Sequence, residues 1–101
     1  MYVLEKGYYN NFSEFRNVVK KQYNEMLSKC DILINPTTNC TAFKINNNFV
    51  NNTDNCTVGA CLAGLPQLSI PCGYNKDGMP IGVCFIGNYF QEAKLLGIAN
   101  I

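Results

Sequence analysis

The sequence contains no histidine among its 101 residues. Histidine is the commonest general base and the commonest side-chain metal ligand, so its absence excludes the most frequent catalytic arrangements and all cysteine–histidine zinc sites. Charged residues are few as well, at 15%, and the formal net charge is +1. A nucleic-acid-binding domain needs a concentrated basic patch, which this composition does not supply. We therefore expect no metal ion, no cofactor and no direct contact with nucleic acid.

Long apolar runs are also missing. No stretch approaches the ~18 apolar residues of a membrane span, so no membrane association is expected. The N-terminal residues MYVLEKGYYNNF lack the basic region and long apolar core of a secretory signal, and they lack the arginine and serine richness of a transit peptide. The sequence leaves the compartment open between the cytoplasm and an organelle such as a plastid or a mitochondrion.

The chain does contain many apolar residues, 48% of the total. This fraction is high for so short a chain, because a small domain has much surface to cover with polar side chains. A piece of a larger domain, whose apolar surface is buried by the rest of that domain, would have this composition.

Six cysteines stand at positions 30, 40, 56, 61, 72 and 84. One interpretation is a secreted module held by disulfides, which the Asn-x-Ser/Thr triplets at Asn11, Asn39, Asn51 and Asn55 would suit. Asparagine is so abundant that such triplets arise by chance, and Cys72 and Cys84 lie inside apolar runs, as buried free thiols do. No Cys-x-x-Cys pair is present, so zinc binding is disfavoured. The pattern favours free structural thiols and leaves the disulfide module as the alternative.

The first half of the chain predicts one helix and one strand. From about residue 11 to 29, apolar residues recur at steps of three and four, which is typical of an amphipathic helix. Asn11 and Glu14 resemble an N-cap and its return partner. A short buried strand is expected at residues 32–34, and Pro36 is expected to end it, because proline cannot donate to a ladder. Residues 38–53 are rich in asparagine and threonine and predict a loop.

The second half predicts a helix, two strands and a final helix. The helix begins near Asp54 and Thr57 and ends at Gly64. Strands follow at residues 67–72 and 79–87, joined by a turn with Asp77-Gly78 at its tip, and a helix occupies residues 90–101. Both strands are continuous apolar runs without alternation, so both of their faces should be covered. A chain of this length can hardly supply that cover, which indicates part of a larger α/β domain.

Several motifs in order carry a resemblance to a known family. They read Cys61-Leu62-Ala63-Gly64-Leu65-Pro66, then Pro71-Cys72-Gly73, then Asp77-Gly78-Met79-Pro80-Ile81-Gly82, then Ile86-Gly87-Asn88-Tyr89-Phe90. Upstream, GYYNNF and CDILINPTT match two further landmarks in the same order. This set resembles the C-terminal part of the amidase signature family, and within it the glutamine-hydrolysing (A-type) subunits of the tRNA-dependent amidotransferases. Cys61, Gly59 and Asn88 depart from the residues usual there.

The resemblance implies a fold, an activity and partners. Residues 1–101 would be the C-terminal portion of a single amidase domain, an incomplete α/β fold with a mixed sheet core covered by helices. The family acts through a Ser–Ser–Lys triad in a Gly/Ser-rich segment, where closely spaced backbone amides build the oxyanion hole. The three serines of this chain lie in no such segment, so no catalytic residue is assigned. The implied partners are the B and C subunits, glutamine and, through the complex, a misacylated tRNA.

One substrate-binding position follows from the resemblance. In the amidotransferase subunits an aspartate shortly before the Leu-Ala-Gly-Leu-Pro segment holds the amino group of the substrate glutamine, and Asp54 matches it. A carboxylate suits this task because it accepts charge-assisted hydrogen bonds from an ammonium group. The alternative is that Asp54 only caps the helix that follows.

Three functions therefore stay open at the level of sequence. The first is the C-terminal segment of the ammonia-generating subunit of an amidotransferase that converts Glu-tRNA(Gln) or Asp-tRNA(Asn) to the amide form. The second is a fragment of another amidase that hydrolyses a small amide. The third, of a different class, is an autonomous extracellular binding module that contains cysteines. The parent protein of the first two is an enzyme, but this chain alone is expected to be inactive.

Overall fold

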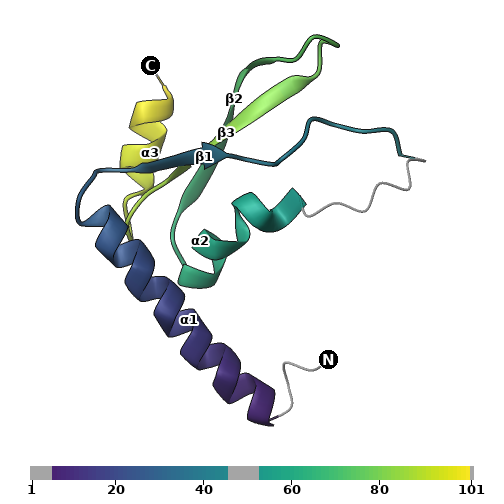
Figure 1. The fold of residues 1–101 in the computed structure, drawn as a ribbon. Coiled ribbons are helices and arrows are strands. Elements are labelled where there is room, and N and C mark those ends of the chain that lie inside the picture. Colours follow the sequence, from purple (N-terminus) through teal and green to yellow (C-terminus); the bar gives the residue numbers. More distant parts are fainter. Residues whose placement is uncertain (1–5, 46–52, 101) are drawn as a thin grey trace.

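The computed structural model describes residues 6–45 and 53–100, with side chains from 11 to 45 and from 55 to 100. Three α-helices and three strands are described, in agreement with the predicted α/β class (Figure 1). Their order and bounds are α1 (Lys6–Leu27), β1 (Leu33–Pro36), the 3₁₀ helix η2 (Thr53–Cys56), α2 (Val58–Ala63), β2 (Gln67–Tyr74), β3 (Pro80–Ile86) and α3 (Glu92–Ala99).

The three strands form one antiparallel sheet in the order β1-β3-β2. Leu33 of β1 and Gln67 of β2 both pair with Ile86 of β3. β1 spans Leu33–Pro36 and not 32–34, and Pro36, which pairs with Val83, is its last residue, so the strand ends at this proline as predicted. Proline is tolerated there because β1 is an edge strand of the described sheet, where a missing N–H need not interrupt a ladder.

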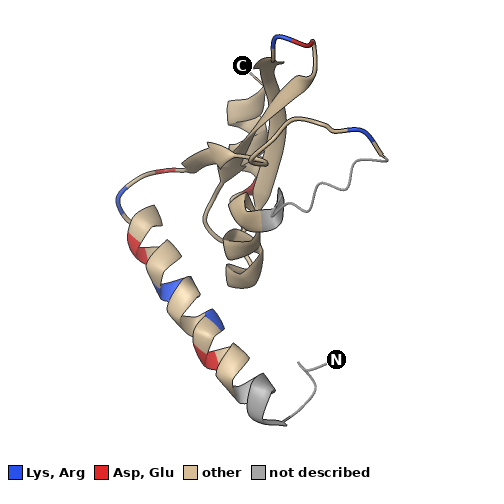
Figure 2. Ribbon diagram, turned by 45° about the vertical axis from the view of Figure 1, so that its right-hand side comes forward, with Lys and Arg blue, Asp and Glu red and all other residues tan. Residues whose placement is uncertain are grey.

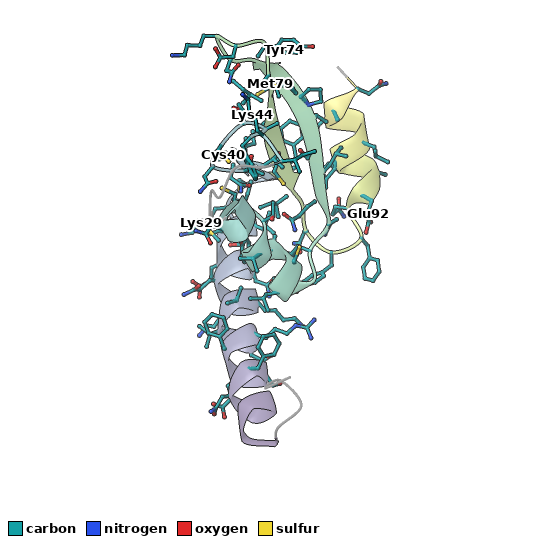
Figure 3. The ribbon with its side chains drawn as sticks, turned by 90° about the vertical axis from the view of Figure 1, so that its right-hand side faces the viewer. Lys29, Cys40, Lys44, Tyr74, Met79 and Glu92 are labelled. Atoms are coloured by element: carbon teal, nitrogen blue, oxygen red, sulfur yellow. The ribbon has the colours of Figure 1, made fainter. Side chains whose placement is uncertain are left out.

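The two faces of the sheet carry different helices. In Figure 3, α3 lies on one side of the strands, and α1 and α2 lie on the other. The main core forms on the side of α1 and α2, where Cys84 and Ile86, two residues apart on β3, face Ala60 and Ala63 of α2. On the opposite side Leu95 of α3 is 2% exposed. A Cβ at Gly87 would lie 3.2 Å from Leu95, so glycine lets α3 approach the end of β3.

Side chains from distant segments satisfy the carbonyls at the end of α2. Arg16 of α1 donates from Nε to the Leu62 carbonyl at 2.8 Å, and the Tyr89 hydroxyl donates to the Ala63 carbonyl at 2.7 Å. Gly64 ends the helix with φ 74°, a left-handed conformation that favours glycine, as the sequence predicted. The Leu-Ala-Gly-Leu-Pro segment is thus fixed to α1 and to the β3–α3 connection.

Helix α1 begins earlier and ends earlier than predicted. It starts at Lys6, so Asn11 lies inside the helix and is not its N-cap, and it ends at Leu27. Val19, Tyr23 and Leu27 pack on the core. Phe12 and Phe15 remain 41% and 56% exposed, because the N-terminal half of the helix extends away from the sheet (Figures 1 and 2). Charged residues follow α1 and the tip of the β2–β3 hairpin, and few lie over the sheet (Figure 2).

The β2–β3 hairpin contains a bulge and an asparagine-centred turn. The pairing register shifts between Pro71 and Gly73, which leaves Cys72 in the bulge and exposed. The prediction that Cys72 is buried is therefore wrong, whereas Cys84 is buried as predicted. At the tip, Asn75 Oδ1 accepts from the N–H groups of Asp77 and Met79, and Gly78 has φ 80°. In Figure 3, Tyr74 and Met79 mark this end of the hairpin.

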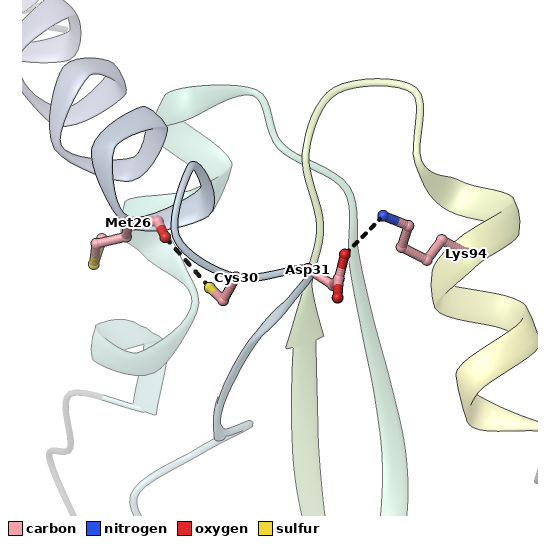
Figure 4. A network of polar contacts seen from close by, with 4 residues as sticks. All are labelled: Met26, Cys30, Asp31 and Lys94. Carbon is pink, nitrogen blue, oxygen red and sulfur yellow. Dashed lines mark hydrogen bonds and ion pairs between the residues drawn. The ribbon is translucent and has the colours of Figure 1, made fainter.

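The segment between α1 and β1 is attached to its surroundings by polar contacts (Figure 4). The Cys30 thiol donates to the Met26 carbonyl at 3.3 Å, and Lys94 of α3 lies 3.5 Å from Asp31. This ion pair is largely exposed and contributes little stability. Helix α3 spans Glu92–Ala99 and not the whole of 90–101, and the Asn100 N–H bonds to the Leu96 carbonyl at its end. Ile101 lies outside the described residues.

The described chain is more extended than an independent domain. Its radius of gyration is 16.2 Å, whereas a compact domain of this length would have about 13 Å. The expected two-sided cover of the strands is not supplied by this chain, since Tyr74 is 74% exposed, Ile81 40% and Ile34 62%. Such an open apolar sheet is consistent with part of a larger domain. Of the helices in the described ranges, none has both the length and the hydropathy to cross a membrane.

The exposed aromatic face of α1 leads to a prediction for the isolated chain. We expect residues 1–101 alone to associate, because Phe12, Phe15 and the open sheet present apolar surface to water. Replacing Phe12 by Lys and Phe15 by Glu should reduce association, measured by sedimentation velocity, without lowering thermal stability. The control Val19→Lys, at a position packed on the core, should lower stability by about 1–3 kcal/mol. A monodisperse wild-type chain would contradict this prediction.

Candidate functional site

The candidate substrate-binding residue Asp54 lies in η2, the 3₁₀ helix that precedes α2. The backbone of η2 is described, but the side chain of Asp54 lies outside the described residues, so its predicted contact with substrate is untested. The N-cap of α2 is Thr57, three residues further on, and its side chain makes no capping hydrogen bond. Thr57 therefore holds the N-cap position of α2, and the alternative that the Asp54 carboxylate caps this helix is untested as well. Asp54 remains a candidate for substrate binding.

Two carboxamide side chains attach the η2–α2 junction to the sheet. Asn35 of β1 donates from Nδ2 to the Cys56 carbonyl at 2.5 Å. Gln67 of β2 donates from Nε2 to the Thr57 carbonyl at 3.2 Å. The two accepting carbonyls are consecutive in the chain, and the two donors come from the two strands that flank β3. We refer to Asn35 and Gln67 together as the amide clamp. It fixes the short segment that carries Asp54 to two strands.

The Gln67 carboxamide also contacts two of the cysteines. Its Nε2 donates to Cys61 Sγ at 3.0 Å, and the Cys84 thiol lies 3.6 Å from its Oε1. Burial raises the pKa of the Cys84 thiol, and the nearby thiols of Cys61 and Cys56 raise it further, against a lowering hydrogen bond from the Leu68 backbone. Cys84 therefore stays protonated and is a poor nucleophile at neutral pH.

Tyr23 of α1 closes the same region from the opposite side. Burial raises the pKa of its hydroxyl, and the Cys84 and Cys61 thiols raise it further. A Cβ at Gly59 would lie 2.7 Å from the Tyr23 hydroxyl oxygen, which is closer than a real Cβ contact. Glycine at position 59 therefore makes room for Tyr23 against α2. The uncharged hydroxyl and the protonated thiol make this interior a structural and not a reactive environment.

Two hollows flank the end of β1. A pocket of about 210 Å³ lies beyond it, lined by uncharged residues: Pro36, Thr38, Asn39, Cys40, Thr41, Ile81 and Gly82. An open groove lies on the side of α1, and its walls include Tyr23, Asn35, Asn55 and Cys56. Asn35 Oδ1 is buried and has no hydrogen-bond partner in the described part of the chain. The Asn35 carboxamide therefore donates from Nδ2 to the Cys56 carbonyl of η2 and to the adjacent Pro36 carbonyl at 3.2 Å, and leaves its acceptor unpaired.

The serines give no catalytic arrangement. Ser28 donates to the Glu25 carbonyl and Ser69 shares a hydrogen bond with Thr37 Oγ1, each at 2.6 Å. These partners are a main-chain carbonyl and a hydroxyl, not the lysine or other base that activates a nucleophile. Ser13 is exposed on α1. No group of three metal-ligating side chains occurs among residues 11–45 and 55–100.

Sequence reasoning missed Asn35 and Gln67. Asn35 stands inside CDILINPTT and Gln67 directly after Leu-Ala-Gly-Leu-Pro, so both adjoin motifs that carry the family resemblance. Each is a carboxamide residue in a largely apolar strand, and a polar side chain on a buried strand face needs a hydrogen-bond partner. This pattern could have identified Asn35 and Gln67 as hydrogen-bonding residues. It could not have identified the carbonyls that they bind.

Comparison with known proteins gives matches along almost the whole chain. The family model described as Amidase matches residues 1–96. The chain is 37% identical over 108 residues to the A subunit of the glutamyl-tRNA(Gln) amidotransferase of Syntrophus aciditrophicus, with 98% of this chain and 22% of that protein covered. It is 40% identical over 110 residues to the A subunit of the enzyme of the same name from Prochlorococcus marinus, with 99% and 23% covered.

Two solved structures share the fold. The crystal structure of the A subunit of the glutamyl-tRNA(Gln) amidotransferase from Thermotoga maritima has a TM-score of 0.79 and 35% identity, covering 88% of this chain and 20% of that one. The structure of 6-aminohexanoate cyclic dimer hydrolase has a TM-score of 0.68 and 26% identity, covering 89% and 22%. The chain thus spans about a fifth of the length of these relatives.

The cysteine environments predict an order of thiol reactivity. In the soluble Phe12→Lys/Phe15→Glu variant, iodoacetamide should modify exposed Cys72 much faster than Cys84, because Cys84 is buried and its pKa is raised. Mass spectrometry of timed samples at pH 8 gives the order. After denaturation without reductant all six cysteines should react. Modification of Cys84 as fast as that of Cys72 would contradict this packing. A complete absence of reactive thiols after denaturation would favour the disulfide-stapled module.

Proposed function

Because the chain belongs to the amidase family, we propose that it is the C-terminal portion of the glutamine-hydrolysing subunit of a tRNA-dependent amidotransferase. In the complete enzyme this subunit would release ammonia from glutamine, and the ammonia would convert Glu-tRNA(Gln) or Asp-tRNA(Asn) to the amide form. The observation that carries the proposal is the 37–40% identity to amidotransferase A subunits over essentially the entire chain.

Within that enzyme, residues 1–101 would supply sheet, core and one substrate contact. The nucleophile expected for an amidase has no candidate among the described serines, whose hydroxyls either bond to a carbonyl, bond to Thr37 or lie exposed on α1. The exposed face of α1 and the open sheet would pack against the remainder of the amidase domain. The B and C subunits would be the partners, and the tRNA would be reached through them.

Asp54 would hold the ammonium group of glutamine. The carboxylate would accept charge-assisted hydrogen bonds from that group, which are about twice as strong as neutral ones. The position of Asp54 supports this role, because η2 is fixed to the sheet through Cys56 and adjoins the open groove at Asn55 and Cys56.

A second candidate function is hydrolysis of another small amide. The similarity to 6-aminohexanoate cyclic dimer hydrolase favours it, because the same fold segment is present in a protein of that name. The two candidates differ in substrate and not in fold. They are separated by testing glutamine against linear and cyclic amides with the same enzyme preparation.

One prediction of the proposed function concerns the activity of the isolated chain and of a chimera. Residues 1–101 alone should hydrolyse no glutamine, because proximity and nucleophilic catalysis require groups that the chain lacks. A chimera in which this chain replaces the matching fifth of the Thermotoga maritima protein should hydrolyse glutamine in the assembled complex. Glutaminase activity of the isolated chain above that of a mock preparation would contradict the proposal. So would a folded, assembled chimera that is active on other amides only.

A further prediction of the proposed function concerns Asp54 in the chimeric complex. Asp54→Asn removes the negative charge and should weaken glutamine use by about 1.5–3 kcal/mol, the worth of a hydrogen bond to a charged group. The measurement is kcat/KM for glutamine. Free ammonia should bypass the defect as nitrogen donor, because ammonia needs no ammonium-binding carboxylate. Asp77→Asn, at the exposed hairpin tip, is the matched control and should change neither reaction. Equal losses with glutamine and ammonia would rule out the substrate role of Asp54.

A further inference from the structure

We infer that Asn35 is a positioning residue for substrate binding, which acts through the Cys56 carbonyl to hold η2 and thereby Asp54 in place. The inference rests on the proposed function and extends it to a residue on a different strand. Gln67 acts in the same way on the adjacent carbonyl, so that the amide clamp as a whole orients the site.

The first argument is the geometry of the clamp. Cys56 is the last residue of η2, and its carbonyl accepts the Asn35 hydrogen bond at 2.5 Å. The Thr57 carbonyl accepts from Gln67 at 3.2 Å. Two consecutive carbonyls held from two strands leave the intervening peptide little freedom to rotate or shift. Asp54 lies only two residues before the first of them, so a shift of this peptide moves Asp54 as well.

The second argument is the unpaired acceptor of Asn35. Its Oδ1 is buried without a partner in the described region, although burial of an unpaired polar atom is unfavourable. An apolar residue at position 35 would avoid this cost and would suit the strand as well. Two bonds from Nδ2 offset this cost, one to the adjacent Pro36 carbonyl at 3.2 Å and the shorter one to the Cys56 carbonyl of η2. Asn35 therefore places η2 at some expense of stability, as residues that hold a functional segment do.

The third argument is the connection of η2 to the rest of the fold. Asn35 lies opposite Cys84 in the β1–β3 register, and Cys84 is 1% exposed in the core. Gln67 lies opposite Ile86, which is 3% exposed. Both clamp residues thus stand beside the most deeply buried part of β3. A site held by side chains on packed strands is more accurately placed than one held by a loop.

The test uses the chimeric amidotransferase complex with glutamine and with ammonia as nitrogen donor. Asn35→Ala should raise KM for glutamine about three- to tenfold, the effect of losing one ordinary hydrogen bond, while kcat changes less than about twofold and the ammonia-dependent reaction is unchanged. The matched control is Ser69→Ala. Ser69 also faces Cys84 in the sheet, but its hydroxyl bonds to Thr37 and not to η2, so KM for glutamine should stay the same.

A double-mutant cycle with Asp54→Asn tests whether Asn35 acts through Asp54. If it does, Asn35→Ala added to Asp54→Asn should raise KM for glutamine by less than about twofold, because the contact to be positioned is already lost. Gln67→Ala is the second arm and should behave as Asn35→Ala does. It keeps the test decisive if Asn35→Ala does not fold, as judged by its melting temperature and complex assembly.

The outcomes separate the inference from the function on which it rests. A wild-type complex without glutamine-dependent activity contradicts the proposed function, and the inference with it. An active wild type whose clamp variants lose the glutamine and ammonia reactions equally makes the clamp a stabilising feature only and overturns the inference. Effects of Asn35→Ala and Asp54→Asn that are simply additive overturn it as well. Selective, non-additive loss of glutamine use supports it.

Discussion

The packing of α2 on the face of β3 that carries Cys84 and Ile86 is the contact on which the rest of the described structure depends. Ala60 and Ala63 of α2 are completely buried there. Their small side chains let the helix lie close to the sheet. A larger side chain at either position would not fit, because protein interiors are close-packed. Because α2 is so close, Asn35 and Gln67 can reach the carbonyls at its start, and Arg16 and Tyr89 can reach its last ones. Helix α1, the η2 segment and the β3–α3 connection are all placed by this one packing contact.

The same arrangement leaves much apolar surface uncovered. Phe12 and Phe15 on α1 and Ile34 and Ile81 on the sheet are more than one third exposed. Charged residues follow α1 and the hairpin tip, and few lie over the sheet (Figure 2). The chain spans about a fifth of its relatives' length, and the proposed remainder of the amidase domain would cover this surface.

Elements with strong local signals could be predicted from the sequence. Gly64 marked the end of α2, Asp77-Gly78 marked the hairpin, and the period of apolar residues marked α1, because these signals arise from backbone conformation and side-chain spacing within a few residues. Element ends were less certain. Helix α1 extends back to Lys6, and β1 extends to Pro36, because an edge position and neighbouring elements override local preference.

The sequence by itself determined the family, the α/β class and Asp54 as the candidate for substrate binding. These follow from short motifs and their order along the chain, which can be read without knowing how the chain packs. Only the tertiary structure decided that Thr57 and not Asp54 occupies the N-cap of α2, that Cys72 is exposed in a bulge, and that Asn35 and Gln67 hold η2. The partners in the clamp are 21 and 10 residues apart in the chain. Such contacts depend on how strands and helices pack, and local sequence does not specify that packing.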